Sequence, residues 1–457
     1  MAMDIADLLT NQHAYFSTGA TLPVDGRRQA LRRLGGMIAQ REGAIADALQ
    51  ADLGKAAFES YMTETGMVLE ELRYVEKHLA RWARPRHVPT PMAQFPARSF
   101  VLKEPYGSVL IMAPWNYPFQ LSLEPLIGAL AAGNCAVIKP SAYAPRTSQL
   151  IADLMADCFA PEYVAVVQGG REENRTLLEQ PFDYIFFTGG IAVGKLVMEK
   201  AAQHLTPVSL ELGGKSPCIV DESADIPLTA RRLAFGKFLN AGQTCVAPDY
   251  VLVHRSVQDA LTAALKKEIA AFFGDDPLAC PDYPRIVNEK HYQRLLGLMD
   301  GAEILFGGRY DGSGRISPTL LGNIDGGSPC MQEEIFGPLL PILPFEELDE
   351  AESFVRSRPK PLALYLFTRN RRVETRLLSS LSFGGGCVND TIIHLATSRM
   401  GFGGVGASGM GSYHGRHSFD TFTHEKSMVK KSLLLDLPIR YHPYTSRHFQ
   451  LLKRFLR

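Results

Sequence analysis

Short apolar runs alternate with helix-like segments from residue 106 onward, and this rhythm constrains the fold more than any other feature. The runs cover residues 108–113, 136–138, 164–167 and 184–187. A parallel strand that is buried on both faces reads as a continuous apolar run, and helices connect such strands. The alternation therefore predicts β-α-β units that build a parallel sheet with helices on both faces.

A helical leader precedes this region and a second α/β block follows it. Apolar residues recur at helical spacing between residues 27 and 82, and four prolines then predict an extended connector over residues 84–100. Residues 219–220 and 251–253 have strand character, and residues 257–273 have the pattern of an amphipathic helix. A chain of 457 residues exceeds one ordinary core, so we expect two or three domains.

Composition narrows the class of protein. Hydrophobic residues make up 46% of the chain, charged residues make up 21%, and the formal net charge is +0, which is typical of a soluble globular protein. Because no basic stripe stands out, nucleic-acid binding has little support. No apolar stretch approaches the roughly 20 residues of a membrane span, so no integral membrane anchor is expected.

Cysteine usage indicates a reducing compartment. The seven cysteines are widely spaced, odd in number and never arranged as Cys-x-x-Cys, which argues against both a disulfide framework and a zinc site. The chain opens with acids at Asp4 and Asp7, whereas a signal peptide opens with basic residues before an apolar run. We therefore expect a cytoplasmic protein without a metal site.

One cysteine, Cys245, stands directly behind the turn-prone segment Gly242-Gln-Thr. The thiolate is the reactive form of cysteine and a local site can tune it, so this position favours a nucleophile; a buried, inert thiol is the alternative. Upstream, Glu211 lies in an apolar strand that runs into a double glycine, which makes it a candidate base. A structural ion pair between Glu211 and Lys215 is the alternative. A nucleophile and a candidate base are the parts that acyl-enzyme chemistry needs.

Two turns that follow predicted strands carry polar side chains. They are residues 114–118 and residues 139–141, and parallel sheets place ligands at the carboxyl ends of their strands. Asn116 offers an amide N–H that could stabilise an oxyanion, and Lys139 could bond ribose or phosphate oxygens. An ordinary turn and a solvated lysine explain these segments equally well, so neither motif decides the function alone.

Three further segments are equally ambiguous in isolation. Residues 187–194 are similar to a strand-to-helix turn that lets a nucleotide approach, but they do not match G-x-G-x-x-G. The acids at 333–334 precede a Gly-Pro turn, and a charged helix start explains them as well as a ligand contact does. Glycines crowd residues 384–411 and permit close backbone approach, which predicts an ordered loop near a ligand or an interface.

Taken in order, these segments resemble the signatures of the aldehyde dehydrogenase superfamily over about residues 25–430. The signatures are Pro114-Trp-Asn-Tyr-Pro118, Leu210-Glu-Leu-Gly-Gly-Lys-Ser-Pro217, Gly242-Gln-Thr-Cys245, Glu334-Ile-Phe-Gly-Pro338 and Phe402-Gly-Gly404. Similarity to the class 3 branch comes from residues 48–55, 245–250 and 408–414, and from Asn389-Asp390 with His394. Each motif is ambiguous alone, whereas the ordered set is specific.

The resemblance implies a role for each matching residue. Cys245 would attack an aldehyde carbonyl, and Asn116 with the Cys245 backbone N–H would hold the resulting oxyanion. Glu211 would activate the water that hydrolyses the thioester, while Tyr117 and His394 would line the substrate channel. The residues implied in cofactor binding are Trp115, Lys139, Ser141, Gly189, Gly194, Leu212, Glu334 and Phe336.

The implied cofactor is NAD or NADP. Many members of the superfamily carry a glutamate after the Lys-Pro-Ser motif, where it accepts the adenosine ribose 2′-hydroxyl and repels a 2′-phosphate. This chain has Ala142 at that position, which predicts dual cofactor use with NADP at least competitive. The substrate implied by class 3 is a hydrophobic medium-chain or aromatic aldehyde, oxidised to the carboxylate.

The implied fold class is α/β, with a Rossmann-like parallel-sheet cofactor domain, an α/β catalytic domain and a small β bridging element in a homodimer. The cofactor domain would consist of residues 1–84 and 106–211, and residues 388–411 would return to it. The catalytic domain would consist of residues 212–387. The bridging element would consist of residues 85–105 and 412–430, and residues 431–457 would form a C-terminal tail. We expect the basic tail to pack on the dimer, with contact to a membrane surface as the alternative.

Two alternative functions stay open. A CoA-acylating or phosphate-dependent relative would pass the thioester to another acceptor, and Glu211 argues against this because it equips the site for water. A catalytically retired binding protein of the same fold is the second alternative. The joint presence of Cys245, Glu211, Asn116 and Glu334 argues against that alternative.

Overall fold

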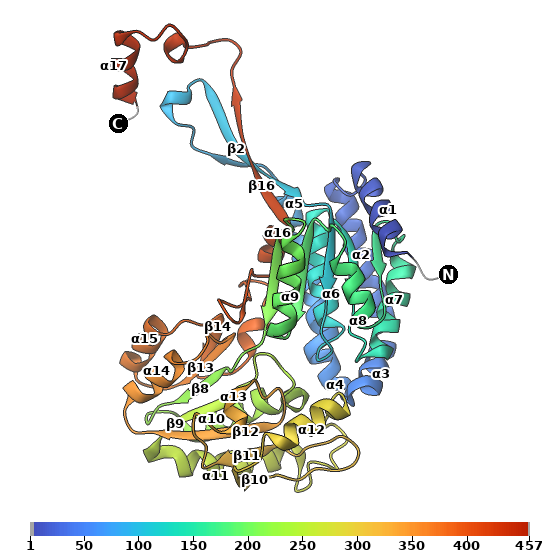
Figure 1. Cartoon of the computed structure of the whole chain (residues 1–457), viewed down its shortest axis with the longest axis vertical. Coiled ribbons are helices and arrows are strands. Elements are labelled where there is room, and N and C mark those ends of the chain that lie inside the picture. Colours follow the sequence, from blue (N-terminus) through green and yellow to red (C-terminus); the bar gives the residue numbers. More distant parts are fainter. Residues whose placement is uncertain (1–3, 456–457) are drawn as a thin grey trace.

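Three β-sheets organise residues 4–455, the part of the chain that the computed structural model describes (Figure 1). A six-stranded sheet and a seven-stranded sheet form the two larger bodies, and a three-stranded sheet forms an arm that projects away from them. Strands and helices alternate through both larger bodies, so the predicted α/β fold class is confirmed.

The six-stranded sheet contains every strand that the first block of apolar runs predicts. Its strands are β3 (Ser108–Met112), β4 (Cys135–Lys139), β5 (Val164–Val166), β6 (Tyr184–Gly189), β7 (Val208–Leu212) and β15 (Gly409–Met410). They lie in the order β15-β7-β6-β3-β4-β5, and β15 alone among them runs antiparallel to its neighbour. The carboxyl ends of β3, β6 and β7 therefore meet at one edge.

Helices cover both faces of this sheet, as the continuous apolar runs predict. They are α1 (Ile5–Ser17), α2 (Val24–Gln40), α3 (Glu42–Leu53), α4 (Ala57–Ser60), α5 (Gly66–Trp82), α6 (Gln120–Ala132), α7 (Pro145–Cys158), α8 (Arg171–Leu178) and α9 (Ile191–Ala202). Val109 and Ile111 pack into the core of α2, α5, α6 and α7, whereas Leu110 and Met112 pack against α1, α8 and α9. Side chains alternate between the two faces of β3 because successive residues of a strand point in opposite directions.

The seven-stranded sheet is built in the same way. Its strands are β8 (Pro217–Val220), β9 (Tyr250–His254), β10 (Glu303–Phe306), β11 (Thr319–Gly322), β12 (Leu339–Phe345), β13 (Ala363–Phe367) and β14 (Gly385–Val388). Their order is β10-β11-β12-β9-β8-β13-β14, with β10 antiparallel to β11 and the other pairs parallel. Its helices are α10 (Ile226–Phe238), α11 (Gln258–Phe273), α12 (Glu289–Gly297), α13 (Pro329–Gln332), α14 (Leu348–Arg356) and α15 (Arg371–Ser380).

The arm consists of β1 (Arg86–Val88), β2 (Ala97–Pro105) and β16 (Thr423–Lys431), all antiparallel. The predicted connector over residues 84–100 is largely extended, with one 3-10 helical turn at Met92–Gln94 between β1 and β2. β16 pairs with β2 from Thr423 opposite Pro105 to Lys431 opposite Ala97. Before β16, α16 (Arg416–Thr421) contacts α6, and after it the chain ends in α17 (Ser446–Phe455) near the tip of the arm (Figure 1). Among residues 4–455, none of the helices has the length and apolar content of a membrane span.

Candidate active site

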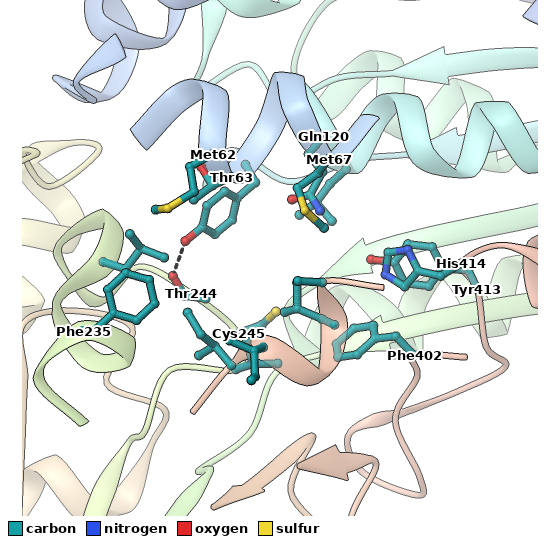
Figure 2. A pocket seen from close by; sticks show the side chains of 18 residues that line it. Met62, Thr63, Met67, Gln120, Phe235, Thr244, Cys245, Phe402, Tyr413 and His414 are labelled. Atoms are coloured by element: carbon teal, nitrogen blue, oxygen red, sulfur yellow. Dashed lines mark hydrogen bonds between the residues drawn. The ribbon is translucent and has the colours of Figure 1, made fainter. Parts of the chain in front are cut away.

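Cys245 lies on the loop between α10 and β9, where two cavities meet. A cavity of about 200 Å³ opens on one side of it and a cavity of about 460 Å³ on the other. Leu121, Phe402 and Tyr413 line both cavities together with Cys245. In Figure 2 the Cys245 side chain stands at the wall of the smaller cavity, between Thr244 and Phe402. The thiol is therefore within reach of molecules in either space.

The loop that presents Cys245 has an unusual backbone. Asn240, Ala241 and Gly242 are consecutive residues with positive φ, at 52°, 50° and 75°. A Cβ at Gly242 would overlap the carbonyl of Gly337, so this turn requires glycine. The segment Gly242-Gln-Thr is thus the tight turn that the sequence indicated, and it directs the following thiol into the junction of the cavities.

The electrostatics of the junction keep the Cys245 thiol protonated. Burial, and after it the nearby carboxyl groups of Glu334 and Glu211, raise its pKa to about 12. The thiolate is the nucleophilic form. A reaction at Cys245 therefore needs a proton acceptor or a positive charge brought in by a ligand.

Asn116 points its side-chain amide at this junction. It follows β3 and lines the larger cavity, and its Nδ2 donates a hydrogen bond to the carbonyl oxygen of Gln243 at 3.0 Å. A primary amide nitrogen carries two hydrogens, so one remains for a ligand. Asn116 and the Cys245 loop are directly joined, as an oxyanion site beside the thiol requires.

Glu211, at the carboxyl end of β7, also faces the larger cavity. Its side chain is buried, and neither carboxyl oxygen has a hydrogen-bond partner among the described residues. Burial raises its pKa well above that of an ordinary glutamate. Lys215, the alternative structural partner, instead binds Asp249 and donates to the carbonyl of Cys330 at 2.7 Å. The carboxyl of Glu211 is thus available to a ligand or a water molecule.

The larger cavity is a groove that is lined in part by the backbone of glycine residues. Gly189 and Gly190 line it at the end of β6, and the N-terminus of α9 follows without a side-chain cap. Free N–H groups at a helix N-terminus attract phosphate oxygens. Trp115, Leu212 and Phe336 add apolar wall, and the ring centroids of Trp115 and Phe336 lie 5.3 Å apart. This combination fits a dinucleotide.

Glu334 closes the groove against a second glycine. A Cβ at Gly213 would overlap the Glu334 carboxyl, so the two segments approach each other at a distance that only glycine permits. The carboxyl accepts a backbone hydrogen bond from Gly214, and burial raises its pKa to about 8. Its position beside the groove suits a bond to a sugar hydroxyl.

Three residues with implied cofactor roles are not among those that line the groove. Lys139 is buried and donates from Nζ to the carbonyl oxygens of Pro140 at 2.8 Å and Gly169 at 2.7 Å, while burial lowers its pKa to about 8. The hydroxyl of Ser141 accepts a hydrogen bond from the backbone of Tyr143. Gly194 lies inside α9, where a Cβ would press on the side chain of Leu212.

The smaller cavity is almost entirely apolar. Its wall is formed by side chains from widely separated segments, among them Met62, Met67, Phe235, Leu239, Val246, Ile392, Ile393 and Leu395. Tyr117 lines it as the resemblance implies, and its hydroxyl lies 2.6 Å from that of Thr244. His394 stands next to lining residues, but its Nδ1 faces the sulfur of Cys387 at 3.6 Å and its ring contacts Tyr365. The structure thus brings Tyr117 to this cavity and turns His394 toward Cys387.

Sequence reasoning missed a buried ion pair beneath the site. Lys55 Nζ lies 2.5 Å from Glu64 Oε1, and both side chains are fully buried. Lys55 also reaches the carbonyl oxygen of Asn116 at 3.3 Å and sits over the Tyr117 ring. Residues 48–55 indicated similarity to the class 3 branch, but no local pattern indicated that Lys55 lies next to the residue-116 turn.

Comparison with known proteins assigns the chain. Residues 1–428 match the aldehyde dehydrogenase family. The chain belongs to the aldehyde dehydrogenase family. It is an enzyme that oxidises aldehydes to carboxylic acids, and enzymes of this family use NAD(P). In this aldehyde dehydrogenase the Cys245 thiol and the buried Glu211 line the same groove.

Individual relatives refine the comparison. The chain is 51% identical over 447 residues to a 4,4′-diaponeurosporen-aldehyde dehydrogenase of Staphylococcus aureus, covering 97% of each chain. It is 44% identical over 443 residues to the dimeric NADP-preferring aldehyde dehydrogenase of the dog, covering 96% of this chain and 98% of that one. A structure of Staphylococcus aureus AldH in a substrate-bound state superposes with a TM-score of 0.97, at 49% identity and full coverage of both chains. The enzyme is therefore similar to class 3 members, in line with the class 3 signatures in its sequence.

Proposed function

We propose that this aldehyde dehydrogenase works through covalent catalysis at Cys245. The Cys245 thiol gives up its proton to the Glu211 carboxylate through a water molecule, and Glu211 passes that proton on to solvent. The thiolate adds to the aldehyde carbonyl, a C–S bond forms, and the carbonyl oxygen becomes the oxyanion of a thiohemiacetal. The free amide hydrogen of Asn116 and the backbone N–H of Cys245 hold that oxyanion. The single observation that carries this proposal is the position of Cys245 at the junction of an apolar cavity and a glycine-lined groove.

When bound, oxidised NAD(P) would supply the acceptor for the hydride that the thiohemiacetal loses as it becomes a thioester. Trp115, Gly189, Leu212, Glu334 and Phe336 line the groove that would hold it. Lys139, Ser141 and Gly194 are not among the residues that line this groove, and we assign them to cofactor binding only from the resemblance to the family. The groove thus offers apolar walls for the rings and backbone amides for the phosphates.

Glu211 completes the cycle in this proposal. Its carboxylate takes a proton from water, and the hydroxide attacks the thioester carbon. The C–S bond breaks, the proton passes from Glu211 to the leaving sulfur, and the carboxylic acid departs with the Cys245 thiol and the Glu211 carboxylate restored. A buried glutamate with a raised pKa is a competent base near neutral pH. Its two unpartnered oxygens leave room for that water.

We infer that the substrate is a hydrophobic medium-chain or aromatic aldehyde. The wall of the smaller cavity, with Met62, Met67 and Phe235, offers dispersion contacts to an apolar chain and few hydrogen bonds. A Staphylococcus relative is named for the apolar aldehyde 4,4′-diaponeurosporen-aldehyde, which points in the same direction. The aldehyde carbon would reach Cys245 with the tail in this cavity.

We infer dual use of NAD and NADP from Ala142. An alanine leaves no carboxylate to repel a 2′-phosphate, and the dog relative is named NADP-preferring. Comparable kcat/KM with the two cofactors is expected. A hundredfold preference for NAD would contradict this part of the proposal.

The proposal extends to assembly and compartment. The domain division would place the six-stranded sheet in the cofactor domain, the seven-stranded sheet in the catalytic domain, and the arm between two copies of a homodimer. The dog relative is named dimeric, and the arm projects from the rest of the chain (Figure 1). All seven cysteines are free, which suits a reducing compartment such as the cytoplasm.

The experiment that tests this function measures initial rates of NADH and NADPH formation over a panel of aliphatic and aromatic aldehydes. Wild type is expected to turn over without CoA, and Cys245→Ala is expected to lose at least about 10⁴-fold in rate because the nucleophile is absent. A requirement for CoA would favour the acyl-transferring alternative. No turnover with any aldehyde and either cofactor would favour the catalytically retired alternative.

A further inference from the structure

One buried side chain, that of Asn240, holds both of the segments that carry the reacting groups. Its Nδ2 donates to the carbonyl oxygen of Asn116 at 2.8 Å and to the carbonyl oxygen of Gln243 at 3.2 Å. Asn116 carries the proposed oxyanion donor, and Gln243 stands two residues before Cys245. The two hydrogens of the Asn240 amide are therefore divided between the two halves of the site.

The bonds around Asn240 close into a ring. The side chain of Asn116 donates to the same carbonyl of Gln243 at 3.0 Å. The side chain of Gln243 in turn donates to the carbonyl of Asn240 at 3.1 Å and to that of Arg285 at 3.0 Å. If Asn240 lost its amide, the backbone of residue 116 would be free to shift relative to the Cys245 loop.

The buried ion pair supports this ring from the other side. Lys55 reaches the carbonyl oxygen of Asn116 at 3.3 Å, and Glu64 accepts hydrogen bonds from the backbone of Phe119 at 2.9 Å and Gln120 at 3.2 Å. The start of α6 and the residue-116 turn are thus tied to one fully buried pair. Lys55 fixes where the turn lies, whereas Asn240 fixes its distance from the nucleophile loop.

The backbone at position 240 explains why asparagine suits it. Its φ of 52° and ψ of 34° lie in the left-handed region, which asparagine tolerates better than other non-glycine residues. Its backbone N–H donates to the carboxyl of Glu59 at 2.9 Å. The position therefore needs both left-handed tolerance and a pair of side-chain donors, and asparagine supplies both.

We propose that Asn240 is a positioning residue that sets the Asn116 amide against the sulfur of Cys245. This inference rests on the proposed function, because it assigns no chemistry to Asn240 itself. An oxyanion donor works only when it is preorganised at hydrogen-bond distance from the developing charge. A displacement of roughly 1 Å from the productive geometry can slow a reaction by on the order of 10²-fold.

The test is Asn240→Gly, because glycine keeps the left-handed backbone and removes both donors. We expect kcat for aldehyde oxidation to fall by about 30- to 100-fold, with the KM for NAD(P) within about threefold of wild type. Ala241→Gly is the matched control, since it adds the same backbone freedom at the next left-handed position and removes no hydrogen bond. Its kcat is expected within about threefold of wild type.

A double-mutant cycle distinguishes positioning from a general loss of structure. If Asn240 acts through Asn116, adding Asn240→Gly to Asn116→Ala lowers kcat by less than about threefold further. Fully multiplicative losses would overturn the positioning role. Alkylation of Cys245 by iodoacetamide needs no oxyanion donor, so its rate is expected to stay within about threefold in every variant; a loss as large as that of kcat would also overturn the proposal.

A second variant covers the case in which Asn240→Gly does not fold. Asn240→Asp keeps the size and the left-handed tolerance but turns the two donors into acceptors that face carbonyl oxygens, so at least the same loss in kcat is expected. An active wild type with both Asn240 variants unaffected would overturn this inference alone. A wild type without NAD(P)H formation would overturn the proposed function instead.

Discussion

The two cavities that meet at Cys245 are built by different means. The larger one is shaped by backbone at Gly189, Gly190 and Gly213, with carboxyl groups at Glu211 and Glu334. The smaller one is shaped by apolar side chains that come from segments between residues 62 and 414. A cofactor groove fixed by backbone stays constant, whereas a cavity of side chains changes shape with single substitutions. The two should therefore respond independently to mutation.

The largest expected effect concerns the thiol that both cavities share. The pKa of Cys245 is raised to about 12. At any pH below this value, each increase of one pH unit therefore raises the thiolate fraction about tenfold. Alkylation by iodoacetamide without cofactor should thus accelerate by about 100-fold between pH 7 and pH 9. Glu334→Gln removes one of the carboxyl groups that raise this pKa and should speed alkylation at a given pH. A plateau at or below pH 8.5 in wild type would contradict the assignment.

A change on the groove side should affect the cofactor alone. In Gly213→Ala the new methyl group overlaps the Glu334 carboxyl and displaces it from the groove. We expect the KM for NAD(P) to rise by roughly tenfold or more, because the displaced carboxyl no longer contacts the cofactor. A tenfold change corresponds to about 1.4 kcal/mol of binding free energy. Gly36→Ala in α2, where a Cβ meets no atom within 4 Å, is the control. An unchanged cofactor KM in Gly213→Ala would show that Glu334 does not border the cofactor.

The smallest expected effect lies on the apolar side. Phe235→Ala removes an aromatic ring that lines the smaller cavity and is 36% exposed, so it should weaken binding of an apolar tail by about 1 kcal/mol. The KM for decanal should rise about fivefold, while those for propanal and NAD(P) stay constant. Equal changes for decanal and propanal would mean that the tail does not occupy this cavity.

Most of the architecture was predictable because its signals are local. The strands around Val109 and Ile185 are continuous apolar runs, and a run of that kind is typical of a strand that is buried on both faces. Gly242 before Cys245 indicated a tight turn because few residues other than glycine permit it. Local patterns did not indicate that Glu211 lies beside Cys245, because 34 residues of chain separate the two. Only the resemblance to a family predicted that they share one site.

The remainder depends on contacts between distant segments. Lys139 was predicted in the turn after a strand, but it is the last residue of β4. Two carbonyl oxygens bind its ammonium group, and only the fold places Gly169 beside it. His394 belongs to a family motif, but its ring packs against Tyr365 and its nitrogen faces Cys387. Lys55 lies between α3 and α4, inside the helical leader of residues 27–82, which carries no catalytic pattern. Such contacts are long-range packing, which periodicity and turn chemistry do not encode.

Trapping of the acyl-enzyme tests the central claim most directly. Glu211→Gln, mixed with NAD(P) and decanal, should release one equivalent of NAD(P)H in a burst, and steady turnover should then fall by about 10²- to 10⁴-fold. Mass spectrometry of the digested protein should find the decanoyl group on the peptide that contains Cys245. An unmodified Cys245 peptide together with steady turnover near the wild-type rate would contradict a thioester intermediate hydrolysed with the help of Glu211.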